Sequence, residues 1–121
     1  MELAQFFLER RSEILLLSGQ HLILVLASTL LAVLIAVPLG ILATRWRYLG
    51  RWILGLTNVI QTIPSLALIG FLLPLPILGG IGARTAMVVL VFYALLPIVR
   101  NTYTGISGVD SAIRQAAQGM G

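Results

Sequence analysis

Long uncharged stretches, interrupted by arginine, proline and glycine, set the pattern of this sequence. No charged residue occurs from Leu22 to Thr44, and none occurs from Trp52 to Ala83. A helix of about 20 apolar residues is needed to cross the roughly 30 Å hydrocarbon layer of a membrane. The first stretch therefore predicts one transmembrane helix. The second is longer and contains several prolines and glycines near Pro76, so we expect it to cross once and then turn.

A third apolar stretch, from Thr85 to Val99, lies between Arg84 and Arg100. The stretch is short for a transmembrane span. Both flanking arginines, however, can extend their charged groups to the membrane interfaces and lengthen it. We therefore predict a third crossing. The expected fold is all-α, a polytopic transmembrane helical bundle.

Residues 1–20 have a different pattern, in which apolar side chains occupy one face of a predicted helix. Leu3, Phe6 and Phe7 share this face, whereas Glu9 and Ser12 lie outside it. Such an amphipathic helix is typical of segments that lie in the membrane interface. We expect residues 1–20 to form an interfacial segment and residues 21–121 to belong to the transmembrane domain.

The distribution of positive charge predicts the orientation in the membrane. All eight basic residues are arginine, and the net charge is +4. They lie at the ends of predicted spans rather than in one cluster, which argues against nucleic-acid binding. Five of them fall on one side: Arg45, Arg47, Arg51, Arg100 and Arg114. Because arginine gathers on the cytoplasmic side, we expect the C-terminal segment in the cytoplasm and the N-terminus outside.

A row of small residues recurs at every fourth position along the first span. Small side chains let two helix backbones approach closely, and helix association in lipid depends on that approach. The alternative is chance, because these residue types are common in spans. We interpret the row as a helix-packing face, made of Ser28, Ala32, Ala36, Gly40 and Thr44.

The second span carries uncharged polar residues at the depth of the bilayer centre. On a continuous helix, Asn58, Gln61, Thr62 and Ser65 would fall within an arc of about 100°. Polar groups at this depth face protein partners or a water-filled path. They either line a solute pathway or hold this helix to its neighbours. Pro64 lies within the patch and is expected to free the carbonyl group of Ile60.

A short polar helix is predicted near the C-terminus. Asp110 is a suitable N-cap, and residues 112–118 favour helix. The segment is weakly apolar and is expected on the cytoplasmic side, which suits docking against a partner surface. We expect the chain to be the front part of a larger membrane protein.

The chain lacks the residue patterns of common catalytic sites. It has no lysine, no cysteine and one histidine, His21. No pair of carboxylates lies within a predicted span, so neither a metal site nor acid–base catalysis is expected. We predict no cofactor and no enzymatic activity. If the protein moves a solute uphill, the energy must come from another subunit.

Three segments resemble permease subunits of bacterial ABC importers. They are residues 61–68 (QTIPSLAL), residues 93–103 (YALLPIVRNTY) and residues 115–121 (QAAQGMG). The first two look like the branch that imports osmoprotectants such as glycine betaine, choline and carnitine. The resemblance covers nearly the whole chain from about His21 onward.

The resemblance implies a cytoplasmic coupling helix at the end of the chain. In the family this loop begins Glu-Ala-Ala and has a glycine four residues after the second alanine. Ala116, Ala117 and Gly121 match that pattern, whereas Gln115 stands in the place of the glutamate. The residues expected to couple to the ATPase are Asp110, Gln115, Ala116, Ala117, Gly119 and Gly121.

The resemblance also implies partners and a cellular location. Family members pair two permease subunits, identical or different, with two ATPase subunits and an extracytoplasmic solute-binding protein. They reside in the bacterial cytoplasmic membrane, and ATP hydrolysis takes place in the partner subunit. Two alternatives stay open: a permease for another small solute, such as an amino acid or a sulfonate, or a small structural or pore-forming membrane protein.

Overall fold

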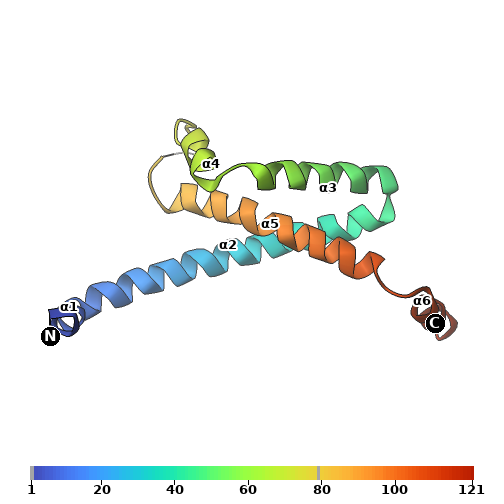
Figure 1. Cartoon of the computed structure of the whole chain (residues 1–121), viewed down its shortest axis with the longest axis horizontal. Coiled ribbons are helices and arrows are strands. Elements are labelled where there is room, and N and C mark those ends of the chain that lie inside the picture. Colours follow the sequence, from blue (N-terminus) through green and yellow to red (C-terminus); the bar gives the residue numbers. More distant parts are fainter. Residues whose placement is uncertain (1, 79) are drawn as a thin grey trace.

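The protein is built from helices that cross one another at steep angles (Figure 1). The computed structural model describes residues 2–78 and 80–121, and within them every regular element is helical. This confirms the all-α prediction. The helices are α1 (Glu2–Glu9), α2 (Arg11–Arg45), α3 (Arg47–Thr62), α4 (Ser65–Leu72), α5 (Ala83–Ser107) and α6 (Ser111–Gly119).

The described helices can supply up to three membrane crossings. Helices α2 and α5 are each long and apolar enough to span a bilayer. Helices α3 and α4 pass the same test only as a pair, bent by 94° at the break between them. Helix α3 runs in the direction opposite to α2, and α5 returns toward the end of the molecule where α2 meets α3 (Figure 1). The α2–α3 corner and α6 therefore lie at the same end of the molecule.

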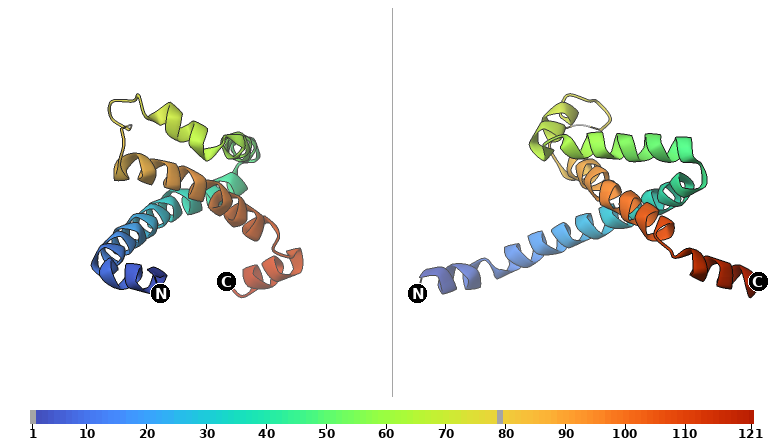
Figure 2. Two further views of the ribbon diagram at one scale, coloured as in Figure 1. Left: turned by 60° about the vertical axis from the view of Figure 1, so that its left-hand side comes forward. Right: turned by 45° about the vertical axis from the view of Figure 1, so that its right-hand side comes forward.

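The most extensive helix contact joins α2 to α5, which cross as shown in Figure 2. On α2, the buried residues Ser28, Ala32, Ala36 and Gly40 recur once per turn. Helix α5 contributes larger buried side chains, among them Val99. Small residues on one helix and branched residues on the other allow close packing without a gap. The fifth residue of the predicted row, Thr44, is half-buried.

Two glycines permit the closest backbone approaches. A Cβ atom at Gly40 would lie 2.6 Å from the Cβ of Thr102 on α5. A Cβ atom at Gly50 on α3 would collide with the carbonyl oxygen of Ala43 on α2. Any larger residue would force these helices apart. The two glycines thus fix how tightly α2 contacts α5 and α3.

The N-terminal segment divides at Arg10 into parts of two helices. Helix α1 ends at Glu9, and α2 begins at Arg11 and runs without interruption into the first span. Arg10 at the junction forms an exposed ion pair with Glu13, with a nitrogen–oxygen distance of 3.4 Å. Residues 11–20 therefore continue the long helix. The interfacial position of residues 1–20 stays a prediction.

Helix α5 is longer than the apolar stretch that predicted it. It begins at Ala83 and continues through Pro97 to Ser107. Its first turn is tied to the preceding loop, because the Thr85 hydroxyl donates a hydrogen bond to the carbonyl oxygen of Gly80. The carbonyl oxygen of Leu78 lies 3.4 Å from the same hydroxyl. Proline is tolerated inside membrane helices because neighbouring groups satisfy the freed backbone.

Candidate functional site

The polar part of the second span coincides with a break in the helix. Helix α3 ends at Thr62, and Ile63 adopts an extended backbone before Pro64. Proline disfavours a helical conformation in the residue that precedes it, which explains the position of the break. The expectation that Pro64 frees the Ile60 carbonyl is wrong. This carbonyl oxygen accepts a hydrogen bond from the Ile63 N–H at 3.1 Å. The Ile60 carbonyl is therefore satisfied by a 3₁₀-type hydrogen bond, from the residue three positions later in the chain.

A tyrosine from another helix forms a hydrogen bond with the backbone at the break. The hydroxyl of Tyr93, in the middle of α5, donates a hydrogen bond to the carbonyl oxygen of Ile63. A backbone carbonyl that leaves a helix at membrane depth needs such a partner. The pattern of the second span contains no sign of this contact. In the sequence, the one sign of this hydrogen bond is the presence of a tyrosine inside an apolar span. The tyrosine alone does not indicate that its partner is the Ile63 carbonyl.

The four predicted pathway residues lie around this break, but not on one continuous helix. Asn58, Gln61 and Thr62 belong to the last turns of α3, whereas Ser65 opens α4 beyond the bend. The single-arc geometry expected for them is therefore wrong for Ser65. All four residues are exposed. Among the described residues, the amide groups of Asn58 and Gln61 enter none of the side-chain hydrogen bonds, so they can contact a solute or a further helix.

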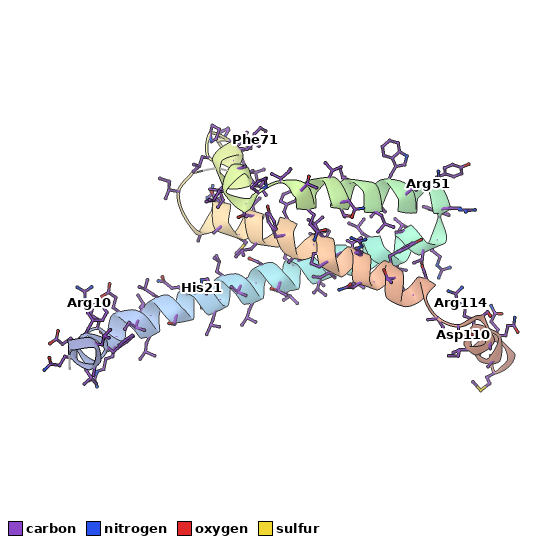
Figure 3. All side chains as sticks on the ribbon, viewed as in Figure 1. Arg10, His21, Arg51, Phe71, Asp110 and Arg114 are labelled. Carbon is purple, nitrogen blue, oxygen red and sulfur yellow. The ribbon has the colours of Figure 1, made fainter. Side chains whose placement is uncertain are left out.

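One local interaction starts the C-terminal helix, and another joins it to α5. Asp110 is the expected N-cap of α6, because its carboxylate accepts a hydrogen bond from the Ala112 N–H at 2.8 Å. Arg114 donates to the carbonyl oxygens of Ile106 at 3.0 Å and Ser107 at 3.3 Å. These carbonyls belong to the last turn of α5, where no helical partner exists for them. Figure 3 shows Asp110 and Arg114 at this junction.

Helix α6 presents an unpartnered apolar face. Ile113, Ala116, Ala117 and Met120 fall within an arc of about 100° on a helical wheel, and all are exposed. Gln115 and the other predicted coupling residues of this segment are also exposed. An exposed apolar face on a short polar helix is typical of a docking element.

No metal site accompanies these features in the described part of the chain, where no three histidine, cysteine or acidic side chains come together. His21 lies on the outer surface of α2, far from the helix break (Figure 3). The candidate site therefore consists of uncharged polar groups, one tyrosine hydroxyl and a separate docking helix.

A set of candidate spans with a polar break, followed by an exposed helix at the arginine-rich end, indicates a polytopic membrane protein. Residues 36–121 match the model of the family described as binding-protein-dependent transport system inner membrane component. The chain belongs to this family of inner-membrane transport permeases.

Individual relatives extend the match to nearly the whole chain. The choline transport system permease protein OpuBB of Bacillus subtilis is 42% identical over 119 residues, covering 98% of this chain and 54% of the relative. The carnitine transport permease protein OpuCB of Listeria monocytogenes is 40% identical, covering 96% and 52%. The osmoprotectant import permease protein OsmW of Salmonella typhimurium is 39% identical, covering 100% and 57%. The chain thus spans about half the length of these relatives. No solved structure gives a significant match.

Proposed function

We propose that this chain acts within the permease subunit of an ATP-driven importer of osmoprotectants such as glycine betaine, choline or carnitine. One observation carries the proposal. Several relatives named for choline, carnitine or osmoprotectant transport are about 40% identical over almost the entire chain. The region matched by the family model, residues 36–121, includes the polar helix break and α6, the two features that transport would use.

The polar break is the proposed part of the solute pathway. Its side chains Asn58, Gln61, Thr62 and Ser65 carry amide and hydroxyl dipoles but no net charge. Such groups can orient a zwitterion or a quaternary ammonium without holding it as tightly as an opposite charge would. The two short helices meet at one hydrogen-bonded hinge, Tyr93 to Ile63. A bend at this point gives the span a place to change shape between inward- and outward-open states.

Helix α6 is the proposed contact with the ATPase subunit. Its exposed apolar face would seat on the partner, and Arg114 would transmit movement of α6 to the end of α5. The coupling residues are Asp110, Gln115, Ala116, Ala117, Gly119 and Gly121. ATP would be hydrolysed by that partner and not by this chain.

The proposed orientation follows from the arginine-rich end. The α2–α3 corner and α6 would face the cytoplasm, and the N-terminus would face outward, where an extracytoplasmic solute-binding protein delivers the solute. A second permease subunit, identical or different, would complete the pathway.

Uptake in osmotically stressed cells tests this proposal. The gene is deleted in a strain that lacks other osmoprotectant importers, and accumulation of radiolabelled glycine betaine, choline and carnitine is measured. We expect at least one of them to be lost and then restored by the plasmid-borne gene. Unchanged accumulation of all three would refute the substrate assignment, and parallel loss of an amino acid or a sulfonate would identify a different cargo.

A further inference from the structure

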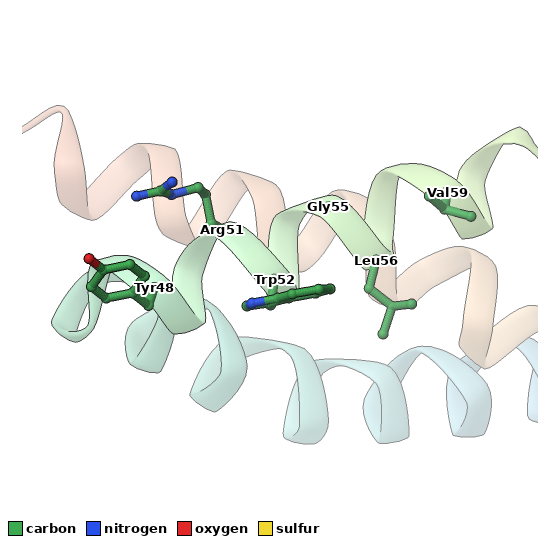
Figure 4. A pocket seen from close by; sticks show the side chains of 6 residues that line it. All are labelled: Tyr48, Arg51, Trp52, Gly55, Leu56 and Val59. Carbon is green, nitrogen blue, oxygen red and sulfur yellow. The ribbon is translucent and has the colours of Figure 1, made fainter.

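A groove runs along the outer face of α3, lined by Tyr48, Arg51, Trp52, Gly55, Leu56 and Val59 (Figure 4). Its volume is about 500 Å³. Tyr48 and Arg51 form the polar end, and Leu56 and Val59 form the apolar end. Gly55 lies between them and has open space where a Cβ atom would be. The absence of a side chain at Gly55 keeps the middle of the groove open.

A second hollow adjoins the polar end of this groove. It has a volume of about 410 Å³, and its lining includes Arg45, Arg47, Arg51 and Tyr103. Arg51 borders both hollows. The apolar groove along α3 and the hollow lined by three arginines at the α2–α3 corner therefore meet at Arg51.

These arginines have no negative partner in the described part of the chain. The ion pair found there is Arg10–Glu13, at the far end of α2. Arg45 and Arg47 take part in no side-chain hydrogen bond among the described residues. The guanidinium carbon of Arg51 lies 5.4 Å from the centroid of the Tyr48 ring, in a cation–π arrangement. Three unpaired cations around one hollow favour an anionic occupant.

The position of the cluster relative to the membrane indicates the kind of anion. Tyr48 and Trp52 are 78% and 79% exposed, and aromatic rings of this type concentrate at the level of lipid headgroups. Val59 follows Arg51 by eight positions, so the groove descends about 12 Å toward the bilayer centre at 1.5 Å per residue. A charged upper end and an apolar lower end match the two parts of a phospholipid.

We propose that this corner binds an anionic phospholipid of the surrounding membrane. Arg45, Arg47 and Arg51 hold its phosphate group, and an acyl chain follows the groove past Gly55. Guanidinium groups bind phosphate oxygens through paired N–H donors. A zwitterionic lipid is disfavoured because its headgroup cation would face the same arginines. The proposal does not depend on which solute the permease carries.

Photolabelling of the intact transporter in nanodiscs tests the proposal. A phosphatidylglycerol and a phosphatidylcholine with the same diazirine-bearing acyl chain are compared, and labelled positions are mapped by mass spectrometry. We expect labelling of residues 52–59 by the anionic lipid to exceed labelling by the zwitterionic lipid, by roughly fivefold for each arginine engaged. Equal labelling by both lipids, or no labelling because another protein segment covers the groove, would overturn it.

Matched variants separate the headgroup contact from the chain contact. R45Q/R51Q should lower the preference for phosphatidylglycerol to the roughly fivefold contribution of Arg47 alone, whereas R10Q/R11Q, at the opposite end of α2, should retain the full preference. Gly55→Leu should reduce tail labelling by both lipids, whereas Gly70→Leu on α4 should not, although both positions have open space at the Cβ. Retention of the full preference in R45Q/R51Q, or unchanged labelling in Gly55→Leu, would each contradict the assignment. The comparison of lipids on the unaltered protein needs no variant to fold.

Discussion

The two halves of α2 are free of charge over most of their length, yet only the second half contains buried residues. In the first half, Leu15, Leu22 and Leu26 are 72%, 60% and 67% exposed. In the second half, Ser28 and Ala32 are 1% and 0% exposed, in contact with the rest of the bundle. The larger and more hydrophobic residues are therefore the exposed ones.

This difference reflects the solvent in which the helix lies. In water, burial of leucine would be the main driving force for packing, but lipid tails are as apolar as leucine. Association of helices in a membrane depends instead on close contact between backbones and side chains. Small residues allow α5 to approach the second half of α2, and the first half extends away from that contact (Figure 1). Within the contacting half, Leu30 and Leu34 are 62% and 63% exposed, whereas Ala32 and Ala36 are 0% exposed. Side-chain size, more than hydrophobicity, therefore decides which positions of α2 are buried.

The strongest test replaces a small contact residue by a large one. Gly40→Leu places side-chain atoms where Thr102 and the Val99 carbonyl already lie. We expect it to destabilise the intact permease by at least about 3 kcal/mol, measured as loss of monodisperse protein on heating in detergent. Gly19→Leu, in the exposed half of the same helix and with open space, should have no measurable effect. Equal losses in both variants would contradict the comparison.

The same contrast exists within α3. Gly50→Ala brings a methyl group against the Ala43 carbonyl oxygen, and a backbone atom cannot move aside cheaply. We expect a loss of about 2 kcal/mol. Gly55→Ala, one and a half turns further along the outer face, should change stability by less than about 0.5 kcal/mol. Thermal unfolding of the two variants measures this difference. A Gly50→Ala protein as stable as the unaltered one would show that α3 can move away from α2 at the corner between them.

Two substitutions on α2 that exchange small and large side chains should differ in their effect on stability. Ala36→Leu adds three carbons at a position with 0% exposure, and it should cost about 1–3 kcal/mol. Leu26→Ala removes three carbons from a position that is 67% exposed and should cost less than about 0.5 kcal/mol. If Leu26→Ala proves more damaging than Ala36→Leu, hydrophobicity rather than size controls the packing of this helix.

A smaller effect is expected where a hydrogen bond, and not shape, joins two helices. Tyr93→Phe keeps the ring but removes the donor to the Ile63 carbonyl. We expect a loss of about 1 kcal/mol, together with faster hydrogen exchange at the first amides of α4. Tyr103→Phe, near the end of the same helix, is the control. Unchanged exchange in Tyr93→Phe would show that the hinge does not depend on this bond.

Helix α6 depends little on packing, because none of its residues is buried. Arg114→Gln removes the donors to Ile106 and Ser107 while preserving the helix. We expect solute-stimulated ATPase activity of the proposed transporter to fall roughly two- to fivefold, corresponding to about 0.5–1 kcal/mol for the two exposed hydrogen bonds together, with stability nearly unchanged. Arg11→Gln serves as the control. An unaltered ATPase response would mean that Arg114 does not position α6.

Part of this architecture could be read directly from the pattern of residues. The uncharged stretches predicted the spans, because crossing hydrocarbon imposes a minimum apolar length. Asp110 predicted the start of α6, because an N-cap acts on the amide two residues away. The small residues from Ser28 to Gly40 recur at a helical spacing and are buried together. Each of these features depends on neighbours along the chain.

Other features required contacts between distant segments. The sequence placed Ser65 and Gln61 on one helical face, but Pro64 separates them into two helices bent by 94°. Tyr93 holds the carbonyl that this bend exposes, from 30 positions away. The approach of Gly50 to Ala43 and the position of Arg51 between two hollows also depend on how helices cross.

The sequence by itself determined that the protein is helical, crosses a membrane and carries its arginines mainly at one end, because hydrocarbon excludes charge and unpaired backbone groups. Only the tertiary structure decided where the second span bends, which residues surround the bend and which arginines share a hollow. Those outcomes depend on the directions in which helices pack, and helix direction is set by contacts between side chains far apart in the chain.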